Sequence, residues 1–187
     1  MTARPILLWP DPCLKEVAAP VPEVTDEIRA IWQDDLEEAV RQIYQTNPFA
    51  HTCGRVCTHR CEDACSIGKR GDPIAIRWLK RYAMDAFTPE QVKAIVGTSN
   101  APSSGRSVAI VGSGPAGLTA ARDLALKGYP VTLFEAHEKL GGTMLLGVPS
   151  YRLPDQMLER DIADVVASGF EVKTGRALGR DFTVSQL

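Results

Sequence analysis

The sequence lacks a long hydrophobic run and a strong net charge, and each absence excludes a class of protein. No apolar stretch approaches the roughly 20 residues that cross a bilayer, and the short run in MTARPILLWPDPC does not reach the length of a signal peptide. With 21 Lys and Arg against 23 Asp and Glu, the formal net charge is -2, which gives no electrostatic reason to expect nucleic acid or an anionic membrane as a partner. We therefore expect a cytoplasmic protein with one large domain or two small ones.

The sequence also has few cysteines, and their number is odd. A closed disulfide framework would leave one of the five unpaired, and structural disulfides are rare in the cytosol. Four of the five lie in CGRVCTHRCEDAC, from Cys53 to Cys65, each four residues after the last. Metal or cluster ligation is the first hypothesis for this group, and four free thiols in a helical core are the alternative.

The spacing of these cysteines sets a geometric limit. In one continuous helix the outer two Cα atoms would lie about 18 Å apart, too far for a single tetrahedral zinc with Zn–S bonds of about 2.3 Å. Residues 53–65 are therefore either not one helix, or their cysteines serve different sites. Three thiolates together with His51 or His59 could still hold one zinc or a labile cluster, although a single His beside a cysteine is more often only solvated.

The first half of the chain otherwise predicts helices. A short strand, Ile6–Trp9, and a Pro-rich extended stretch come first. A helix of roughly twenty residues follows, with Thr25 as its N-cap and Asn47-Pro48 at its end. Another helix is expected at about 74–87, before a Gly-, Ser- and Pro-rich linker at 97–106. The apolar residues of the long helix recur with a 3.6-residue period: Ile28, Ile31, Trp32, Leu36, Ala39, Val40 and Ile43.

After the linker the pattern changes to strand, helix and strand. Val108–Val111 and Val131–Phe134 are short β-branched runs, as buried parallel strands require. The helix between them begins at Pro115 and ends at about Lys127, with Gly128 just beyond. This order is the first half of a Rossmann unit. A helix at 155–168 and a strand at 170–174 would complete a sheet of about three strands with an exposed edge and an incomplete core.

The turn after the first strand carries a dinucleotide-binding pattern, Gly112-x-Gly114-x-x-Gly117. The three glycines would allow a tight turn, close approach of a pyrophosphate and close packing of the helix on the strand. Glu135 ends the second strand and can accept hydrogen bonds from a ribose diol, and its charge favours FAD or NAD over NADP. The alternative is a glycine-rich turn without a ligand. The residues predicted to bind the cofactor here are Gly112, Ser113, Gly114, Pro115, Ala116, Gly117 and Glu135.

The residues after Glu135 resemble a known family. Gly141-Gly142 completes an E-x5-G-G arrangement similar to the adenine-dinucleotide domain of two-dinucleotide-binding flavoproteins. GGTMLLGVPSYRLP, residues 141–154, resembles the GG-x4-GIP-x2-RLP signature of the glutamate synthase small-subunit family, which includes the reductase half of dihydropyrimidine dehydrogenase. The resemblance implies FAD as the cofactor and adds Gly142 and Arg152 to its predicted contacts. It also implies a further domain for NAD(P)H beyond DFTVSQL, so the chain resembles a fragment.

The cysteine-rich stretch resembles the same family. TNPFAHTCGRVCTHRCEDAC, residues 46–65, is similar to its TNPFP-x3-GRVCP-x2-CE-x2-C segment, and DPIAIRWLKRYAMD, residues 72–85, to the stretch that follows. The resemblance implies that Cys57, Cys61 and Cys65 ligate two [4Fe–4S] clusters shared with cysteines farther upstream. This chain has only Cys13 before Cys53, so the cluster site is incomplete, and no ligand role is assigned to Cys53.

The N-terminal segment resembles a different family. Residues 4–39 are similar to the opening of peptide deformylases, but the later motifs of those enzymes are absent, so deformylase activity is not expected. The predicted fold class is α/β, a partial Rossmann-type FAD-binding domain preceded by a mainly helical iron–sulfur-type domain. The predicted divisions are the deformylase-like segment 1–39, the cysteine-rich domain 40–96, the linker 97–106 and the incomplete FAD-binding domain 107–187.

The expected function is electron transfer from NAD(P)H through FAD and the clusters to an acceptor subunit or domain. No catalytic acid or base is assigned, because the cofactors carry the chemistry. Two alternatives remain open: a zinc-stabilised nucleotide-binding or interaction module, and a non-functional chimera or truncation.

Overall fold

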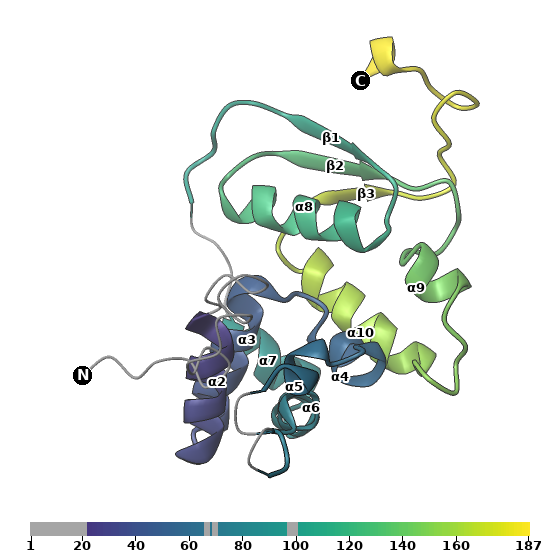
Figure 1. Cartoon of the computed structure of the whole chain (residues 1–187). Helices are drawn as coiled ribbons and strands as arrows, with labels where there is room; N and C mark the ends of the chain where they lie inside the picture. The colour runs from purple at the N-terminus through teal and green to yellow at the C-terminus, as the bar shows by residue number, and fades with distance from the viewer. Residues whose placement is uncertain (1–21, 66–67, 69–70, 97–100) are drawn as a thin grey trace. The chain divides into compact units, whose positions relative to one another are not determined.

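The computed structural model describes residues 22–65, 68, 71–96 and 101–187 of the 187-residue chain. The chain divides into two compact units, residues 1–96 and 97–187, of which the first is helical and the second contains a small sheet (Figure 1). The strand predicted at residues 6–9 and Cys13 lie outside the described residues. Within the described part of the chain, no helix combines the length and the apolar character needed to span a membrane.

Two helices, α2 (Pro22–Trp32) and α3 (Leu36–Thr46), replace the single helix predicted between Thr25 and Asn47. That prediction was wrong because Asp34 is left-handed, with φ of 60°. The Asp34 N–H donates to the Ile31 carbonyl at 3.1 Å and the Asp35 N–H donates to the Ala30 carbonyl at 2.9 Å, the pattern of a Schellman motif. Asp35 then caps α3, since its carboxylate accepts the Glu38 N–H at 3.0 Å.

Two details of the predicted long helix were also wrong. Thr25 is not an N-cap but lies inside α2, which begins at Pro22, a residue type that suits a first helical turn. Trp32, assigned to the apolar face, is 89% exposed. It is the last residue of α2, and the chain reverses two residues later.

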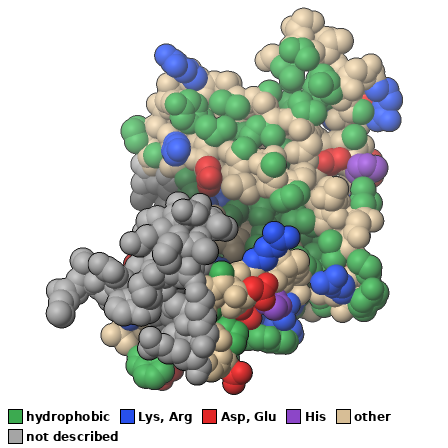
Figure 2. All heavy atoms as spheres, in the orientation of Figure 1, with side chains coloured by type: hydrophobic (Ala, Val, Ile, Leu, Met, Phe, Trp, Pro, Cys, Tyr) green, Lys and Arg blue, Asp and Glu red, His purple; other side chains and the backbone are tan. Residues whose placement is uncertain are grey.

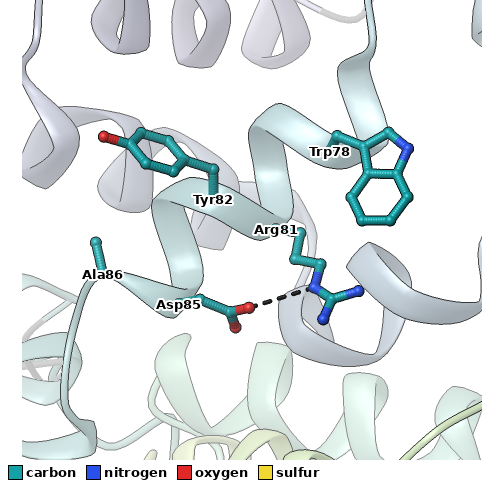
Figure 3. A pocket seen from close by; sticks show the side chains of 5 residues that line it. All are labelled: Trp78, Arg81, Tyr82, Asp85 and Ala86. Atoms are coloured by element: carbon teal, nitrogen blue, oxygen red, sulfur yellow. Dashed lines mark hydrogen bonds and ion pairs between the residues drawn. The ribbon is translucent and has the colours of Figure 1, made fainter.

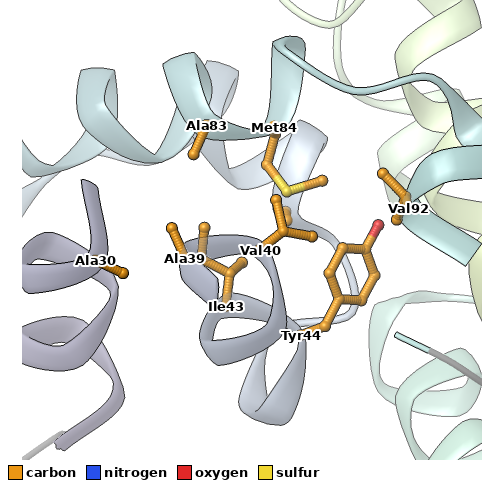
Figure 4. Close-up of a cluster of buried hydrophobic side chains, with 9 residues drawn as sticks. Ala30, Ala39, Val40, Ile43, Tyr44, Ala83, Met84 and Val92 are labelled. Carbon is orange, nitrogen blue, oxygen red and sulfur yellow. The ribbon is translucent and has the colours of Figure 1, made fainter. Parts of the chain in front are cut away.

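The core of the helical unit lies between these helices and two later ones, α6 (Ile76–Asp85) and α7 (Pro89–Val96). Helix α6 confirms the helix predicted at about 74–87, whereas α7 was not predicted. Figure 4 shows Met84 of α6 pointing toward Val40 of α3, with alanines on α2, α3 and α6 nearby. The buried cluster consists of Ala30, Ala39, Val40, Ile43, Tyr44, Ala50, Ala83, Met84 and Val92.

The second unit contains three parallel strands in the order β1-β2-β3. Strands β1 (Val108–Val111) and β2 (Val131–Phe134) have the predicted bounds, and β3 (Glu171–Lys173) lies within the predicted range. Helix α8 (Pro115–Leu126) connects β1 to β2, and α10 (Asp155–Val166) precedes β3 and packs on α8. The parallel order, with helical crossovers between the strands, confirms the Rossmann-like half unit.

The two faces of this sheet differ in how they are covered. Ile110 and Leu133 are partners in the register and face α8, and Leu133 is fully buried. On the other face Ala109 and Val111 are exposed, while the Phe134 ring lies 4.7 Å from that of Phe182. Figure 2 shows hydrophobic side chains at the surface over the sheet. Among the described residues, β1 pairs on one side only.

Candidate functional site

The glycine-rich turn after β1 has the geometry that the sequence predicted. Gly112 has φ of 99°, which only glycine adopts readily, and Gly114 is the N-cap of α8. A Cβ added at Gly117 would lie 2.0 Å from the Gly112 carbonyl oxygen and 3.5 Å from Ile110 Cγ2. Gly117 is therefore required for α8 to pack against the turn and β1.

A second glycine pair packs directly on this turn. Gly142 has φ of 51°, and a Cβ added there would lie 2.8 Å from the Gly114 Cα atom. The Gly141 N–H donates to the Ser113 carbonyl at 3.1 Å and to the Ser113 hydroxyl at 3.2 Å. The short helix α9 (Thr143–Leu146) begins immediately afterwards. The two glycine segments, 28 residues apart in sequence, thus form one continuous backbone surface.

Glu135 joins this surface to the end of β2. It is 6% exposed, and its carboxylate accepts the Ser113 N–H at 2.8 Å, the Ser113 hydroxyl, and the His137 N–H at 2.9 Å. Burial raises the pKa of Glu135, but the hydrogen bonds from Ser113 and His137 outweigh it and hold the pKa below its ordinary value. Because a carboxylate offers about four acceptor positions, the three bonds leave roughly one for a ribose hydroxyl.

The space beside the turn fits the pyrophosphate of a dinucleotide. A Cβ added at Gly112 or Gly114 would meet no atom within 4 Å, and Pro115 and Ala116, at the start of α8, are exposed. The first amide groups of a helix have no partner within the helix, and they attract phosphates. The open cradle, the free helix start and the ionised Glu135 together suit an adenine dinucleotide.

Two predicted cofactor residues take less direct positions. Ser113 is fully buried, so its side chain links Glu135 to Gly141 and does not face the open cradle. Arg152 lies in the turn before α10, where its N–H donates to the Pro149 carbonyl at 2.9 Å, and its side chain is exposed. The linking role of Ser113 could not be read from the sequence, because it depends on contacts 22 and 28 residues away.

The cysteine-rich stretch is not one helix. Helix α4 (Ala50–Val56) ends at Cys57, and the four-residue helix α5 (Arg60–Asp63) follows after His59, which is left-handed with φ of 45°. Cys57 is exposed, Cys61 is partly buried, and Cys65 is 2% exposed. Burial raises the pKa of the Cys61 thiol, and the nearby Cys57 and Glu62 raise it further.

The first turn of α6 holds the segment from Cys57 to Glu62, which we call the cysteine loop. The sequence did not reveal this role of α6. The Arg77 N–H donates to Glu62 Oε1 at 2.8 Å, and the Arg77 guanidinium donates to the Cys57 carbonyl at 3.3 Å. Helix α6 therefore contacts the backbone of Cys57 directly, and it contacts Glu62, the residue that follows Cys61. A Glu next to a predicted ligand was the available signal, but its partner lies 15 residues farther along the chain.

The two histidines of this region face carboxylates. His51 is 1% exposed, with Nδ1 3.6 Å from Asp85 Oδ1, and His59 Nδ1 lies 3.3 Å from Glu62 Oε2. Among the described residues, no three His, Cys, Asp or Glu side chains are grouped to hold a metal ion. The arrangement therefore does not form the closed single-zinc site that was one alternative. It remains compatible with thiolates that each serve a cluster shared with other ligands.

Residues of α6 and the residue that follows it line a groove that contains no cysteine (Figure 3). It is lined by Trp78, Arg81, Tyr82, Asp85 and Ala86. Asp85 accepts hydrogen bonds from Arg55 of α4 at 2.8 Å and from Arg81 at 3.3 Å. Burial raises the pKa of Asp85, but the bonds from these arginines outweigh it and hold the pKa below its ordinary value. Asp85 therefore joins α6 to the helix that precedes Cys57.

Two family models match the chain. Residues 11–92 match dihydropyrimidine dehydrogenase domain II, 4Fe-4S cluster, and residues 110–171 match an NAD(P)-binding Rossmann-like domain. The first match begins within residues 4–39, for which the sequence suggested a resemblance to another family, and it continues through the cysteine-rich stretch.

Several characterised proteins are similar along nearly the whole chain. The NADP(+)-dependent formate dehydrogenase subunit beta of Moorella thermoacetica is 38% identical over 94% of this chain and 27% of that protein. The NADPH-Fe(3+) oxidoreductase subunit beta of Geobacter sulfurreducens is 36% identical over 94% and 26%. The glutamate synthase [NADPH] small chain of Mycobacterium tuberculosis is 33% identical over 89% and 33%. The chain thus spans between a quarter and a third of these relatives.

A solved structure, histamine dehydrogenase from Rhizobium sp. 4-9, matches with a TM-score of 0.38 and 22% identity, over 82% of this chain and 21% of that one. The sequence relatives carry the assignment, because their similarity extends across both the helical and the Rossmann-like unit. On that basis the chain is a homologue, across both of its units, of the glutamate synthase [NADPH] small chain and of the NADP(+)- and NADPH-dependent beta subunits named above.

Proposed function

We propose that this chain is the part of an NAD(P)H-dependent oxidoreductase that binds FAD and contributes three cysteine ligands to [4Fe–4S] clusters, from which electrons pass to an acceptor subunit or domain. The observation that carries the proposal is the open glycine cradle beside the ionised Glu135. The relatives' names, subunit beta and small chain, support an acceptor on a partner subunit. The same proposal divides the chain into the segment 1–39, the cysteine-rich domain 40–96, the linker 97–106 and the FAD-binding domain 107–187.

In this proposal the backbone binds most of the flavin nucleotide. Gly112 and Gly114 leave room for the pyrophosphate, the amides at Ala116 and Gly117 donate to it, and Glu135 accepts from the ribose. Gly142, which packs against Gly114, shapes the cradle from the opposite side. The sequence contains one G-x-G-x-x-G turn, which we assign to FAD. NAD(P)H would then bind in the part of the relatives that this chain does not span.

The thiols of Cys57, Cys61 and Cys65 are the proposed cluster ligands. When bound, FAD supplies hydride acceptance and the clusters supply single-electron transfer. The chain's own contribution is to orient the thiols through α4, α5 and α6. Cys57 lies at the end of α4 and Cys61 in α5, with the left-handed His59 turning the backbone between them.

The proposal is tested by replacing each cysteine with serine in the full chain. After anaerobic reconstitution with iron and sulfide, C57S, C61S and C65S should bind less iron than the unaltered chain. C53S is the matched control, since Cys53 belongs to the same stretch but is not a proposed ligand, and it should keep its iron. Flavin content should be equal in all four variants. Iron uptake that does not depend on Cys57, Cys61 or Cys65, or stoichiometric zinc in place of iron, would contradict the ligand assignment.

A further inference from the structure

Arg77 occupies a special place beside the cysteine loop. Its backbone N–H donates to Glu62 and its guanidinium donates to the Cys57 carbonyl. The guanidinium carbon also lies 5.0 Å from the centre of the Trp78 ring, within the range of a cation–π contact. The Arg77 side chain is therefore held against the backbone of Cys57, one of the three proposed cluster ligands.

One hydrogen-bond donor of this side chain has no acceptor. Arg77 Nε is buried and makes no hydrogen bond within the described part of the chain. A buried donor without a partner costs roughly 1–3 kcal/mol, so such groups are uncommon unless a ligand completes them. A cluster held by thiolates carries sulfur atoms that accept hydrogen bonds, and these bonds help to set its reduction potential.

We propose that Arg77 is a positioning residue for the cluster that Cys57 ligates. Arg77 would fix the segment between Cys57 and Cys61, and its positive charge and its Nε–H would face the sulfur atoms of that cluster. The inference rests on the proposed iron–sulfur function. Reduction adds negative charge to a cluster, so a nearby guanidinium stabilises the reduced form more than the oxidised form. Removing that charge lowers the reduction potential.

The chain offers a matched control in Arg81. It lies on the same helix one turn later, and its guanidinium carbon is 5.4 Å from the same Trp78 ring. Figure 3 shows that Arg81 instead points to Asp85, to which its Nε donates at 3.3 Å. A substitution at Arg81 thus removes the same charge from the same helix but leaves the Arg77 hydrogen bonds to Glu62 and to the Cys57 carbonyl in place.

The experiment compares R77Q, R77K and R81Q with the unaltered full chain after anaerobic reconstitution with iron and sulfide. Circular dichroism checks that each variant folds, and a redox titration followed by absorbance gives the midpoint potential. R77Q should raise the oxidised-to-reduced ratio at a fixed potential by about tenfold. This corresponds to a midpoint potential ~59 mV more negative for a one-electron couple. R77K, which keeps the charge, should shift less, and R81Q should stay near the unaltered chain.

Loss of iron from folded R77Q, with iron retained in R77K and R81Q, would also support the inference, because it would show that Arg77 holds the loop. Equal shifts in R77Q and R81Q, or full iron content with an unchanged potential in R77Q, would overturn it. If the unaltered chain binds no iron, the proposed function fails and this inference fails with it. Iron in the unaltered chain with no effect at Arg77 refutes the inference alone.

Discussion

Two glycines of the same turn should respond to alanine in opposite ways, and the contrast separates cofactor binding from folding. A Cβ at Gly114 meets no atom within 4 Å, whereas a Cβ at Gly117 would lie 2.0 Å from the Gly112 carbonyl oxygen. Gly114 has φ of -66°, which alanine adopts without strain. The open space at Gly114 is where the pyrophosphate is proposed to lie, and the crowded space at Gly117 is where α8 meets the turn.

The magnitudes follow from these distances. G114A should change the free energy of unfolding by no more than about 1 kcal/mol, because the poorer N-cap is offset by a less flexible unfolded chain. A methyl group in the path of the pyrophosphate should weaken FAD binding by roughly 10- to 200-fold, the range for one misplaced methylene. In G117A the new atom lies about 1.4 Å inside ordinary contact with the backbone, so the overpacking should cost at least about 1–3 kcal/mol.

The assay pairs a flavin-fluorescence titration of the full chain with urea unfolding followed by circular dichroism. G114A should fold like the unaltered chain and bind FAD weakly, while G117A should be less stable in the absence of FAD. A G114A variant that binds FAD as tightly as the unaltered chain would refute the assignment of the cradle. A fully stable G117A would refute the reasoning about helix packing.

Two further substitutions test the electrostatics and the helix boundary. E135Q should destabilise the protein at neutral pH, because Ser113 and His137 lose a charged acceptor. The folded pKa of Glu135 lies below its ordinary value of 4.5. The contribution of the Glu135 carboxylate to the free energy of unfolding is therefore complete above pH 4.5 and is lost as the pH falls through the folded pKa. Unfolding measured from pH 7 to pH 3 should therefore show the difference between the two proteins shrinking below about pH 4.5, and a constant difference would contradict the assignment. D35A removes the N-cap of α3 and should lower the free energy of unfolding by about 1 kcal/mol, measured by urea denaturation with D34A as a comparison; an unchanged midpoint in D35A would argue against the cap.

The Rossmann-like unit was largely predictable because its signals are local. Val108–Val111 and Val131–Phe134 were predicted with the bounds the structure shows, since β-branched runs and a glycine-rich turn specify strand and turn over a few residues. The helical unit was harder. The apolar period continues from Ile28 to Ile43 without a gap, so it did not reveal that Asp34 turns left-handed and that Asp35 starts a new helix.

The sequence proposes residues for the candidate site, and their binding roles stay predictions, but it does not show which contacts they make. The glycines, Glu135 and the cysteines carry recognisable spacing. Their partners do not, since the Ser113–Glu135 bond spans 22 residues and the Arg77–Cys57 contact spans 20. These pairs are formed by the packing of separate elements. A single sequence therefore suggests a chemistry for the site but does not reveal the residues that hold it in place.

The central claim, that this chain binds both FAD and iron–sulfur clusters, is tested most directly on anaerobically purified full-length chain. Its absorbance spectrum would be recorded, and flavin, iron and zinc would be quantified on the same sample. The account predicts close to one flavin per chain, together with iron and the broad absorbance near about 400 nm that clusters give. A colourless protein without flavin or iron, or one that contains zinc alone, would contradict it.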